Sequence, residues 1–97
     1  MKVLVTGTAG FVGYFTALSL LARGDEVVGL DNINDYYEVG LKYGRLSRAG
    51  IDKAAVDYGK KVASSAYPGY SFIKMNLEDR DMVEKLFRVE KFDRVCH

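Results

Sequence analysis

Three glycines, each three residues from the next, separate the first two segments of this 97-residue chain. Residues 2–6 before them form a short apolar run without alternation, which is typical of a strand covered on both faces of a parallel sheet. After them, apolar residues recur every three or four positions from Phe11 to Ala22, as on one face of a helix. This pattern predicts a strand, a tight turn and a helix, which together open a βαβ unit.

Further strands and helices are expected to alternate along the chain. Strands are predicted at 26–30, 70–75 and 92–97, with helices over about 36–48, from Asp52 to about Val62, and after 76–79. This alternation predicts an α/β fold, a doubly wound parallel sheet of about four strands in the spatial order 3-2-1-4. We expect residues 1–97 to form one unit that stops within its fourth strand.

The composition excludes several classes of protein. Fourteen basic and 13 acidic residues give a net charge of +1, too little to indicate a nucleic-acid or polybasic membrane partner. The lone Cys96 cannot form an internal disulfide and fits a cytoplasmic protein. Neither Cys96 nor His97 has further ligands nearby in sequence, so we expect no metal site.

The glycine turn carries the strongest chemical signal. A dinucleotide pyrophosphate needs backbone N–H groups and the positive end of a helix dipole, without side chains that hold it away. Gly7 would allow the tight turn, Gly10 the close approach of the pyrophosphate, and Gly13 the packing of the helix on the sheet. The alternative is a glycine-rich turn without a ligand. A P-loop is excluded because no Gly-Lys-Ser or Gly-Lys-Thr is present.

Asp31 follows the second predicted strand, 18 residues after Gly13. A carboxylate there can accept hydrogen bonds from the adenosine ribose hydroxyls and would repel a 2′-phosphate, which predicts NAD rather than NADP. The alternative is a solvated turn carboxylate. Two interpretations also stay open for Lys42 and Arg45, which either reach the adenosine end or are solvated helix charges.

Five segments resemble one known family: 3–13, 28–32, Asn34-Asp35-Tyr36-Tyr37 with its continuation to Leu46, 72–79 and 92–97. They are similar to the N-terminus of extended short-chain dehydrogenases/reductases of the nucleotide-sugar epimerase and dehydratase group. The Asn-Asp-Tyr-Tyr stretch is like that of UDP-glucuronate 4-epimerases. The resemblance implies a Rossmann-like fold and NAD as cofactor.

The resemblance also implies which residues contact NAD. The pyrophosphate would lie on the glycine turn, the ribose at the end of the second strand, and the adenine at the pair after the third strand. The residues so implied are Gly7, Gly10, Phe11, Val12, Gly13, Asp31, Asn32, Asn34, Asp35, Asn76 and Leu77. Asn34 and Asp35 could equally cap the following helix, and Asn76, where the family commonly has Asp, could equally be a helix N-cap.

The reaction implied is inversion at C4 of a UDP-sugar, such as UDP-glucuronate, by transient oxidation with NAD. In the family a Tyr-x-x-x-Lys pair provides the base, in a later part of the fold. We expect no such pair here and assign no catalytic residue. Alternatives are a dehydratase, decarboxylase or reductase of the same family, or a non-catalytic NAD-binding module.

Two expectations follow from the predicted end of the sheet. With the nicotinamide side of the crevice incomplete, NAD should bind weakly, through its adenosine half. An open strand edge or apolar face should cause self-association, so we expect a homo-oligomer.

Overall fold

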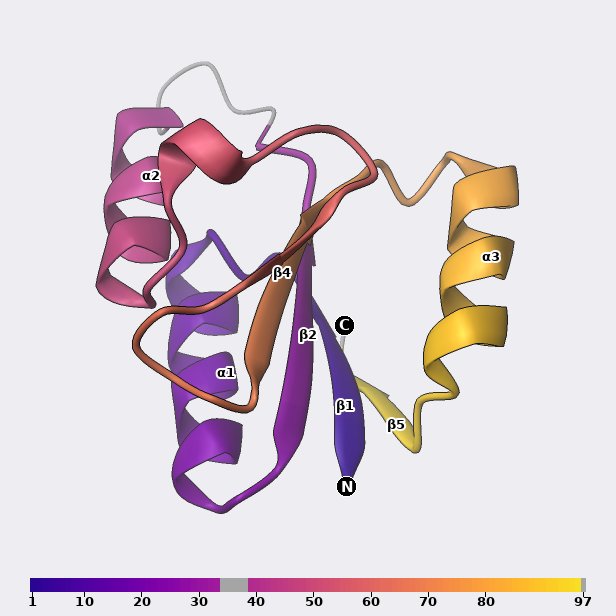
Figure 1. The fold of residues 1–97 in the computed structure, drawn as a ribbon, viewed down its shortest axis with the longest axis horizontal. Helices are drawn as coiled ribbons and strands as arrows, with labels where there is room; N and C mark the ends of the chain where they lie inside the picture. The colour runs from indigo at the N-terminus through magenta and orange to yellow at the C-terminus, as the bar shows by residue number, and fades with distance from the viewer. Residues whose placement is uncertain (34–38, 97) are drawn as a thin grey trace.

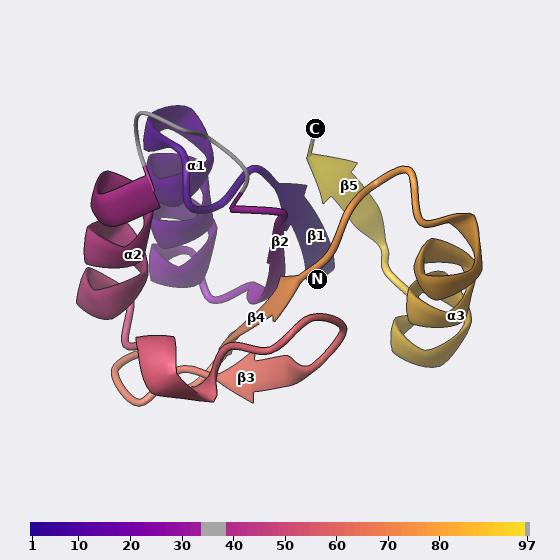
Figure 2. The ribbon, with the colours of Figure 1, turned by 90° about the horizontal axis from the view of Figure 1, so that it is seen from above.

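The computed structural model describes residues 1–33 and 39–96. One sheet lies between helices on both of its faces, with α1 and α2 on one side and α3 on the other (Figures 1 and 2). In chain order the elements are β1 (Lys2–Thr6), α1 (Phe11–Ala22), β2 (Glu26–Asp31), α2 (Val39–Arg48), the 3₁₀ helix η1 (Lys53–Ala55), β3 (Lys61–Ala63), β4 (Tyr70–Lys74), α3 (Arg80–Glu90) and β5 (Arg94–Cys96).

The strands lie in the order β3-β4-β2-β1-β5. The neighbours from β4 to β5 run parallel, and Val27 of β2 lies opposite both Val3 of β1 and Tyr70 of β4. Without β3, this is the order 3-2-1-4 that the sequence predicts, so the expected doubly wound sheet is confirmed. Because the strands are parallel, the segments that follow β1, β2 and β4 all leave the sheet at the same edge.

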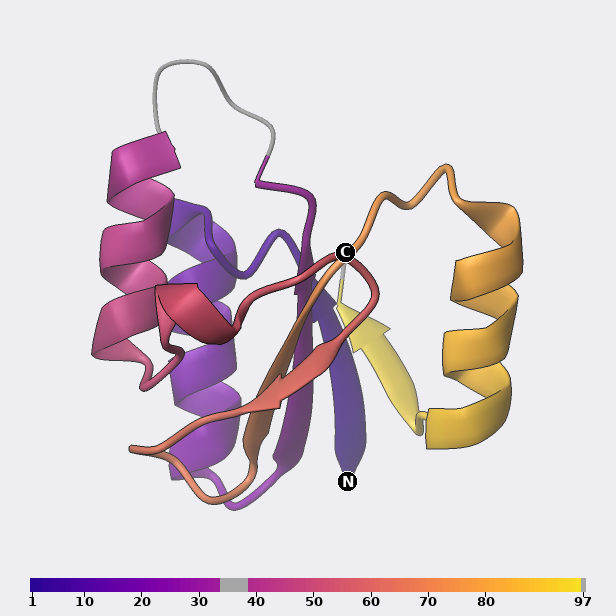
Figure 3. The same cartoon turned by 45° about the horizontal axis from the view of Figure 1, so that its top comes forward.

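The prediction of a helix from Asp52 to about Val62 is wrong. Asp52 does act as an N-cap, since its carboxylate accepts a hydrogen bond from the Ala54 N–H at 3.0 Å, but only the short η1 follows. The chain then becomes extended, and β3 pairs antiparallel with β4 at the edge of the sheet (Figure 3). Pairing satisfies the outer backbone groups of β4, which an exposed edge would leave open. Val62 is buried between two exposed neighbours, so the strand also fits the core.

Each face of the sheet has its own apolar layer. On the α1 and α2 side, Phe72 is completely buried and packs with Leu46 and Ile51. On the α3 side, Leu86 packs against a smaller set from the sheet, which includes Leu4, Val28, Leu30, Ile73 and Met75. None of the helices in the described ranges is long and apolar enough to span a bilayer.

Gly13 allows α1 to lie against the turn that precedes it, since a Cβ there would overlap the Gly7 carbonyl group. We expect Gly13→Ala to lower the free energy of unfolding by about 1–3 kcal/mol, because the backbone has to shift. Gly44→Ala is the matched control, since a Cβ in the middle of α2 meets no atom within 4 Å. Gly44→Ala should raise the free energy of unfolding by up to ~1 kcal/mol. Urea denaturation measures the unfolding free energy of both variants. An unchanged denaturation midpoint for Gly13→Ala would contradict the close packing of α1 on the turn.

Glu90 joins α3 to two strands of the sheet. Its Oε1 lies 2.9 Å from the Nζ atoms of both Lys2 on β1 and Lys61 on β3. Hydrogen bonds from these two lysines lower the pKa of Glu90 below its ordinary value of 4.5, and burial opposes this shift only in part. The native state therefore favours the ionised form of Glu90 more strongly than the unfolded chain does.

This lowered pKa predicts how stability responds to acid. The contribution of Glu90 should be fully present above its ordinary pKa of 4.5 and lost as the pH falls through the lower native pKa. Glu90→Gln should therefore be less stable than the wild type at neutral pH, and the difference should shrink on acidification. Chemical denaturation across pH measures this difference. A gap that stays constant down to strong acid would contradict the assigned ion pairs.

Candidate functional site

The turn between β1 and α1 is held by backbone hydrogen bonds. The N–H of Gly7 donates to the Leu30 carbonyl at 2.7 Å, and the Gly7 carbonyl accepts from the Gly10 N–H at 2.9 Å. Gly7 has a φ of +71°, which favours glycine. α1 starts at Phe11 with neither a side-chain cap nor an acidic residue in its first turn. No side chain of the cap or of the first turn therefore compensates the positive end of the α1 dipole, which suits an anion such as a phosphate.

Asp31 ends β2 beside this turn and is only 4% exposed. Its Oδ2 accepts a hydrogen bond from the Ala9 N–H at 3.0 Å, and its Oδ1 accepts one from the Ile33 N–H at 2.8 Å. The interpretation of Asp31 as a solvated turn carboxylate is therefore wrong. The carboxylate is buried and fastens the glycine turn to the end of β2.

Two cationic side chains of α2, those of Lys42 and Arg45, extend to Asp31 and to the glycine turn. The Nζ of Lys42 lies 3.2 Å from Oδ1 of Asp31, and the Lys42 side chain is only 13% exposed. Arg45 donates a hydrogen bond from Nη1 to the Ala9 carbonyl at 3.0 Å. The interpretation of these two residues as solvated helix charges is wrong, because both contact groups at the glycine turn or at Asp31. The positive charge of Lys42 offsets the buried carboxylate.

Asn76 lies in the loop between β4 and α3. The N-cap of α3 is Asp79, whose Oδ1 accepts a hydrogen bond from the Met82 N–H at 3.4 Å. The interpretation of Asn76 as the helix N-cap is therefore wrong. Asn76 and Leu77 lie instead at the edge of the sheet where β1, β2 and β4 end.

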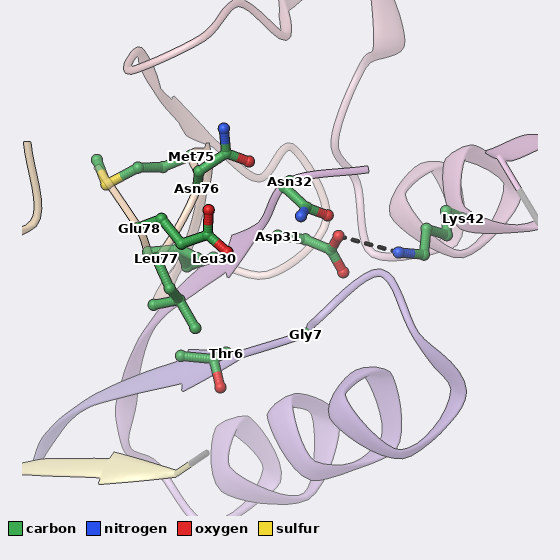
Figure 4. A pocket seen from close by; sticks show the side chains of 10 residues that line it. All are labelled: Thr6, Gly7, Leu30, Asp31, Asn32, Lys42, Met75, Asn76, Leu77 and Glu78. Atoms are coloured by element: carbon green, nitrogen blue, oxygen red, sulfur yellow. Dashed lines mark hydrogen bonds and ion pairs between the residues drawn. The ribbon is translucent and has the colours of Figure 1, made fainter. Parts of the chain in front are cut away.

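A cleft of about 500 Å³ opens at this edge. Figure 4 shows Asp31 and Lys42 facing one another in it, with Asn76, Leu77 and Glu78 on the loop after β4. The volume is within the range of roughly 300–1,000 Å³ that small-molecule sites occupy. The residues that line the cleft are Thr6, Gly7, Leu30, Asp31, Asn32, Lys42, Met75, Asn76, Leu77 and Glu78.

A second hollow of about 310 Å³ lies on the other side of the glycine turn. It shares Thr6 and Gly7 with the first cleft and extends past Val12 to Cys96 of β5. It also includes Gly10 and Gly13. The glycine turn therefore lies between two hollows, where the strand order reverses between β1 and β5. An elongated ligand could cross the turn from one hollow to the other.

The expectation that no Tyr-x-x-x-Lys spacing occurs is wrong, because Tyr70 and Lys74 have it. They lie on β4, where four residues extend about 13 Å, whereas on a helix the two side chains would be neighbours. Tyr70 is 3% exposed, and burial raises the pKa of its hydroxyl to about 12. A hydroxyl so buried and so weakly acidic is unsuited to act as a general base, so this pair is structural.

Sequence patterns did not indicate every residue of the cleft. The lining residues that were not predicted are Thr6, Leu30, Met75 and Glu78. Only the parallel register brings the ends of β1 and β4 beside Asp31. Asn34 and Asp35 lie outside the described residues. Within the described ranges, no group of three or more His, Cys, Asp or Glu side chains is placed to hold a metal ion.

Comparison with known proteins gives relatives that are much longer. UDP-glucuronate 4-epimerase 4 of Arabidopsis thaliana is 38% identical over 97 residues, which covers 100% of this chain and 18% of that protein. The chain spans less than a quarter of the length of the first curated relatives that it matches. Their complete fold therefore extends well beyond the part that corresponds to this chain.

Two solved structures have the same fold. The dTDP-glucose 4,6-dehydratase of Bacillus anthracis, in complex with NAD, has a TM-score of 0.69 at 18% identity, over 98% of this chain and 25% of that one. The UDP-glucose 4-epimerase of Thermus thermophilus, also in complex with NAD, has a TM-score of 0.60 at 32% identity, over 98% of this chain and 22% of that one.

The sequence profile of one family, described as GDP-mannose 4,6 dehydratase, matches residues 4–97. That range is nearly the whole chain and includes the glycine turn, Asp31 and the loop after β4. The chain therefore belongs to this family of nucleotide-sugar epimerases and dehydratases, within the extended short-chain dehydrogenases/reductases.

Proposed function

We propose that this chain binds NAD at the carboxyl edge of its sheet. The observation that carries the proposal is the buried Asp31 carboxylate beside an uncapped helix N-terminus, with a cleft on one side of the turn and a hollow on the other. A pyrophosphate on the glycine turn would place adenosine in the cleft and direct the nicotinamide toward Cys96. The NAD complexes of two proteins with the same fold support this choice of cofactor.

Each part of the cofactor has its own proposed contacts. The pyrophosphate lies against the start of α1, the ribose beside the end of β2 and the adenine beside the loop after β4. The proposed residues are Gly7, Gly10, Phe11, Val12, Gly13, Asp31, Asn32, Asn76 and Leu77, together with Asn34 and Asp35 outside the described ranges. Lys42 and Glu78 join this set because they line the same cleft.

We further propose that residues 1–97 are the NAD-binding N-terminal unit of a cytoplasmic enzyme that inverts C4 of UDP-glucuronate. NAD would supply the transient oxidation at C4. The 38% identity to a UDP-glucuronate 4-epimerase over the entire chain supports this substrate. A dehydratase is the second candidate, favoured by the description of the matching family. The base and the sugar site would belong to a part of the enzyme that these residues do not include.

Calorimetric titration with NAD and with NADP tests the cofactor. We expect weak binding of NAD through its adenosine half and weaker binding of NADP. A 2′-phosphate would meet the carboxylates of Asp31 and Glu78, and among the described residues that line the cleft only Lys42 is a cation. Equal or tighter binding of NADP would overturn the assignment to NAD. Submicromolar binding of NAD would contradict the expectation that the adenosine half alone contributes.

Lys42 should set how strongly NADP is rejected. Lys42→Gln removes the charge that offsets Asp31, so we expect the ratio of the NADP and NAD dissociation constants to rise about tenfold. Lys85→Gln on α3 is the control with the same loss of charge on an exposed residue, and its ratio should stay unchanged. An unchanged ratio in Lys42→Gln would show that the lysine does not face the ribose.

We also propose that the chain self-associates. β5 pairs with β1 on one side, and its Val95 is 47% exposed, so strand edge and apolar surface coincide there. Sedimentation at several concentrations should show a weight-average mass that rises with concentration. A monomer at all concentrations would contradict this.

A further inference from the structure

Tyr58 lies in a tight turn beside the end of β4. The Lys60 N–H donates to the Asp57 carbonyl at 3.1 Å, and Gly59, within this turn, has a φ of +75°. The Gly59 N–H then donates to the Lys74 carbonyl at 2.8 Å. Tyr58 therefore sits where β4 ends, next to the loop that forms one wall of the cleft.

The hydroxyl of Tyr58 has two partners in that loop. It accepts a hydrogen bond from the Asn76 backbone N–H at 3.2 Å and donates one to Oδ2 of Asp79 at 2.7 Å. The Asp79 N–H in turn donates to the Asn76 carbonyl at 3.0 Å. The Tyr58 hydroxyl thus connects Asn76, near the start of the loop, with Asp79, which caps α3.

The negative charge of Asp79 determines which of these two contacts the Tyr58 hydroxyl donates. The hydroxyl has one proton, which it gives to the Asp79 carboxylate, and a short bond to an ionised acceptor is stronger than a neutral one. Donation to the carboxylate polarises the oxygen and strengthens its acceptance from Asn76. The Tyr58 side chain is 47% exposed, so burial of the ring does not account for its position as well as the two hydrogen bonds do.

We infer that Tyr58 is a positioning residue for the adenine end of the cleft. Its hydroxyl fixes the backbone at Asn76, and so determines where the Asn76 amide meets the ligand. This inference rests on the proposed function, in which Asn76 contacts the adenine. Tyr58 itself does not line the cleft, so its effect is exerted through the loop.

The test compares NAD with its desamino analogue, nicotinamide purine dinucleotide, which has a hydrogen atom in place of the adenine amino group. The wild type should prefer NAD by about tenfold, since an amide placed for the amino group loses a partner in the analogue. Tyr58→Phe should weaken NAD binding about threefold to tenfold and reduce this preference to near unity. Asn76→Ala should have the same two effects. The double variant Tyr58→Phe/Asn76→Ala should lose no more affinity for NAD than either single variant.

Two further variants complete the design. Tyr67→Phe is the control, because it also removes one phenol hydroxyl but lies before the start of β4, at the opposite end of the strand from the cleft. Its preference should equal that of the wild type. Asp79→Asn keeps a residue that caps helices well and removes the negative charge that strengthens the bond from Tyr58. Its preference for NAD should lie between those of the wild type and Tyr58→Phe.

The outcomes separate the two proposals. A Tyr58→Phe variant with weaker binding of both dinucleotides but the wild-type preference would overturn the positioning role and leave the proposed function standing. A wild type that does not bind NAD would overturn both. If Asn76→Ala keeps the preference, the adenine does not meet Asn76, and the role of Tyr58 fails with that placement.

Discussion

The contacts of a single buried carboxylate hold the cleft together. Asp31 accepts hydrogen bonds from the backbone of Ala9 in the glycine turn and of Ile33 after β2, and it pairs with Lys42 of α2. A carboxylate removed from water is costly unless it is paired and hydrogen-bonded, so these partners are required and not incidental. Three segments that are distant in sequence are thereby fixed around one charge.

The same edge of the sheet gathers what a dinucleotide needs. The parallel register brings the ends of β1, β2 and β4 together, and Gly13 lets α1 approach closely enough to direct its N-terminus at the turn. The loop after β4 is held by Tyr58 from outside the cleft. The walls of the cleft are therefore set by hydrogen bonds to backbone groups, which leaves the side chains of Asn76 and Glu78 at its surface.

Most of the fold could be predicted from sequence because its signals are local. The unbroken apolar strands, the glycine spacing and the helical period after Phe11 each fall within a few residues, and the order of the four parallel strands follows from their alternation with helices. The structure of segment 52–62 could not be predicted, because its apolar residues have the spacing of a helix. Pairing with the otherwise open edge of β4 is a long-range contact, and it outweighs this local preference. The partners of Lys42 and Tyr58 were also hidden, since each lies at least 11 residues away.

Amide chemical shifts of the labelled protein during titration with NAD report where on the molecule the dinucleotide binds. We expect the largest changes at Gly7, Gly10, Asp31 and Asn76, which surround the cleft and the turn. Changes confined to the groove between α1 and α2, around Leu41 and Arg48, with these four amides unmoved, would contradict it.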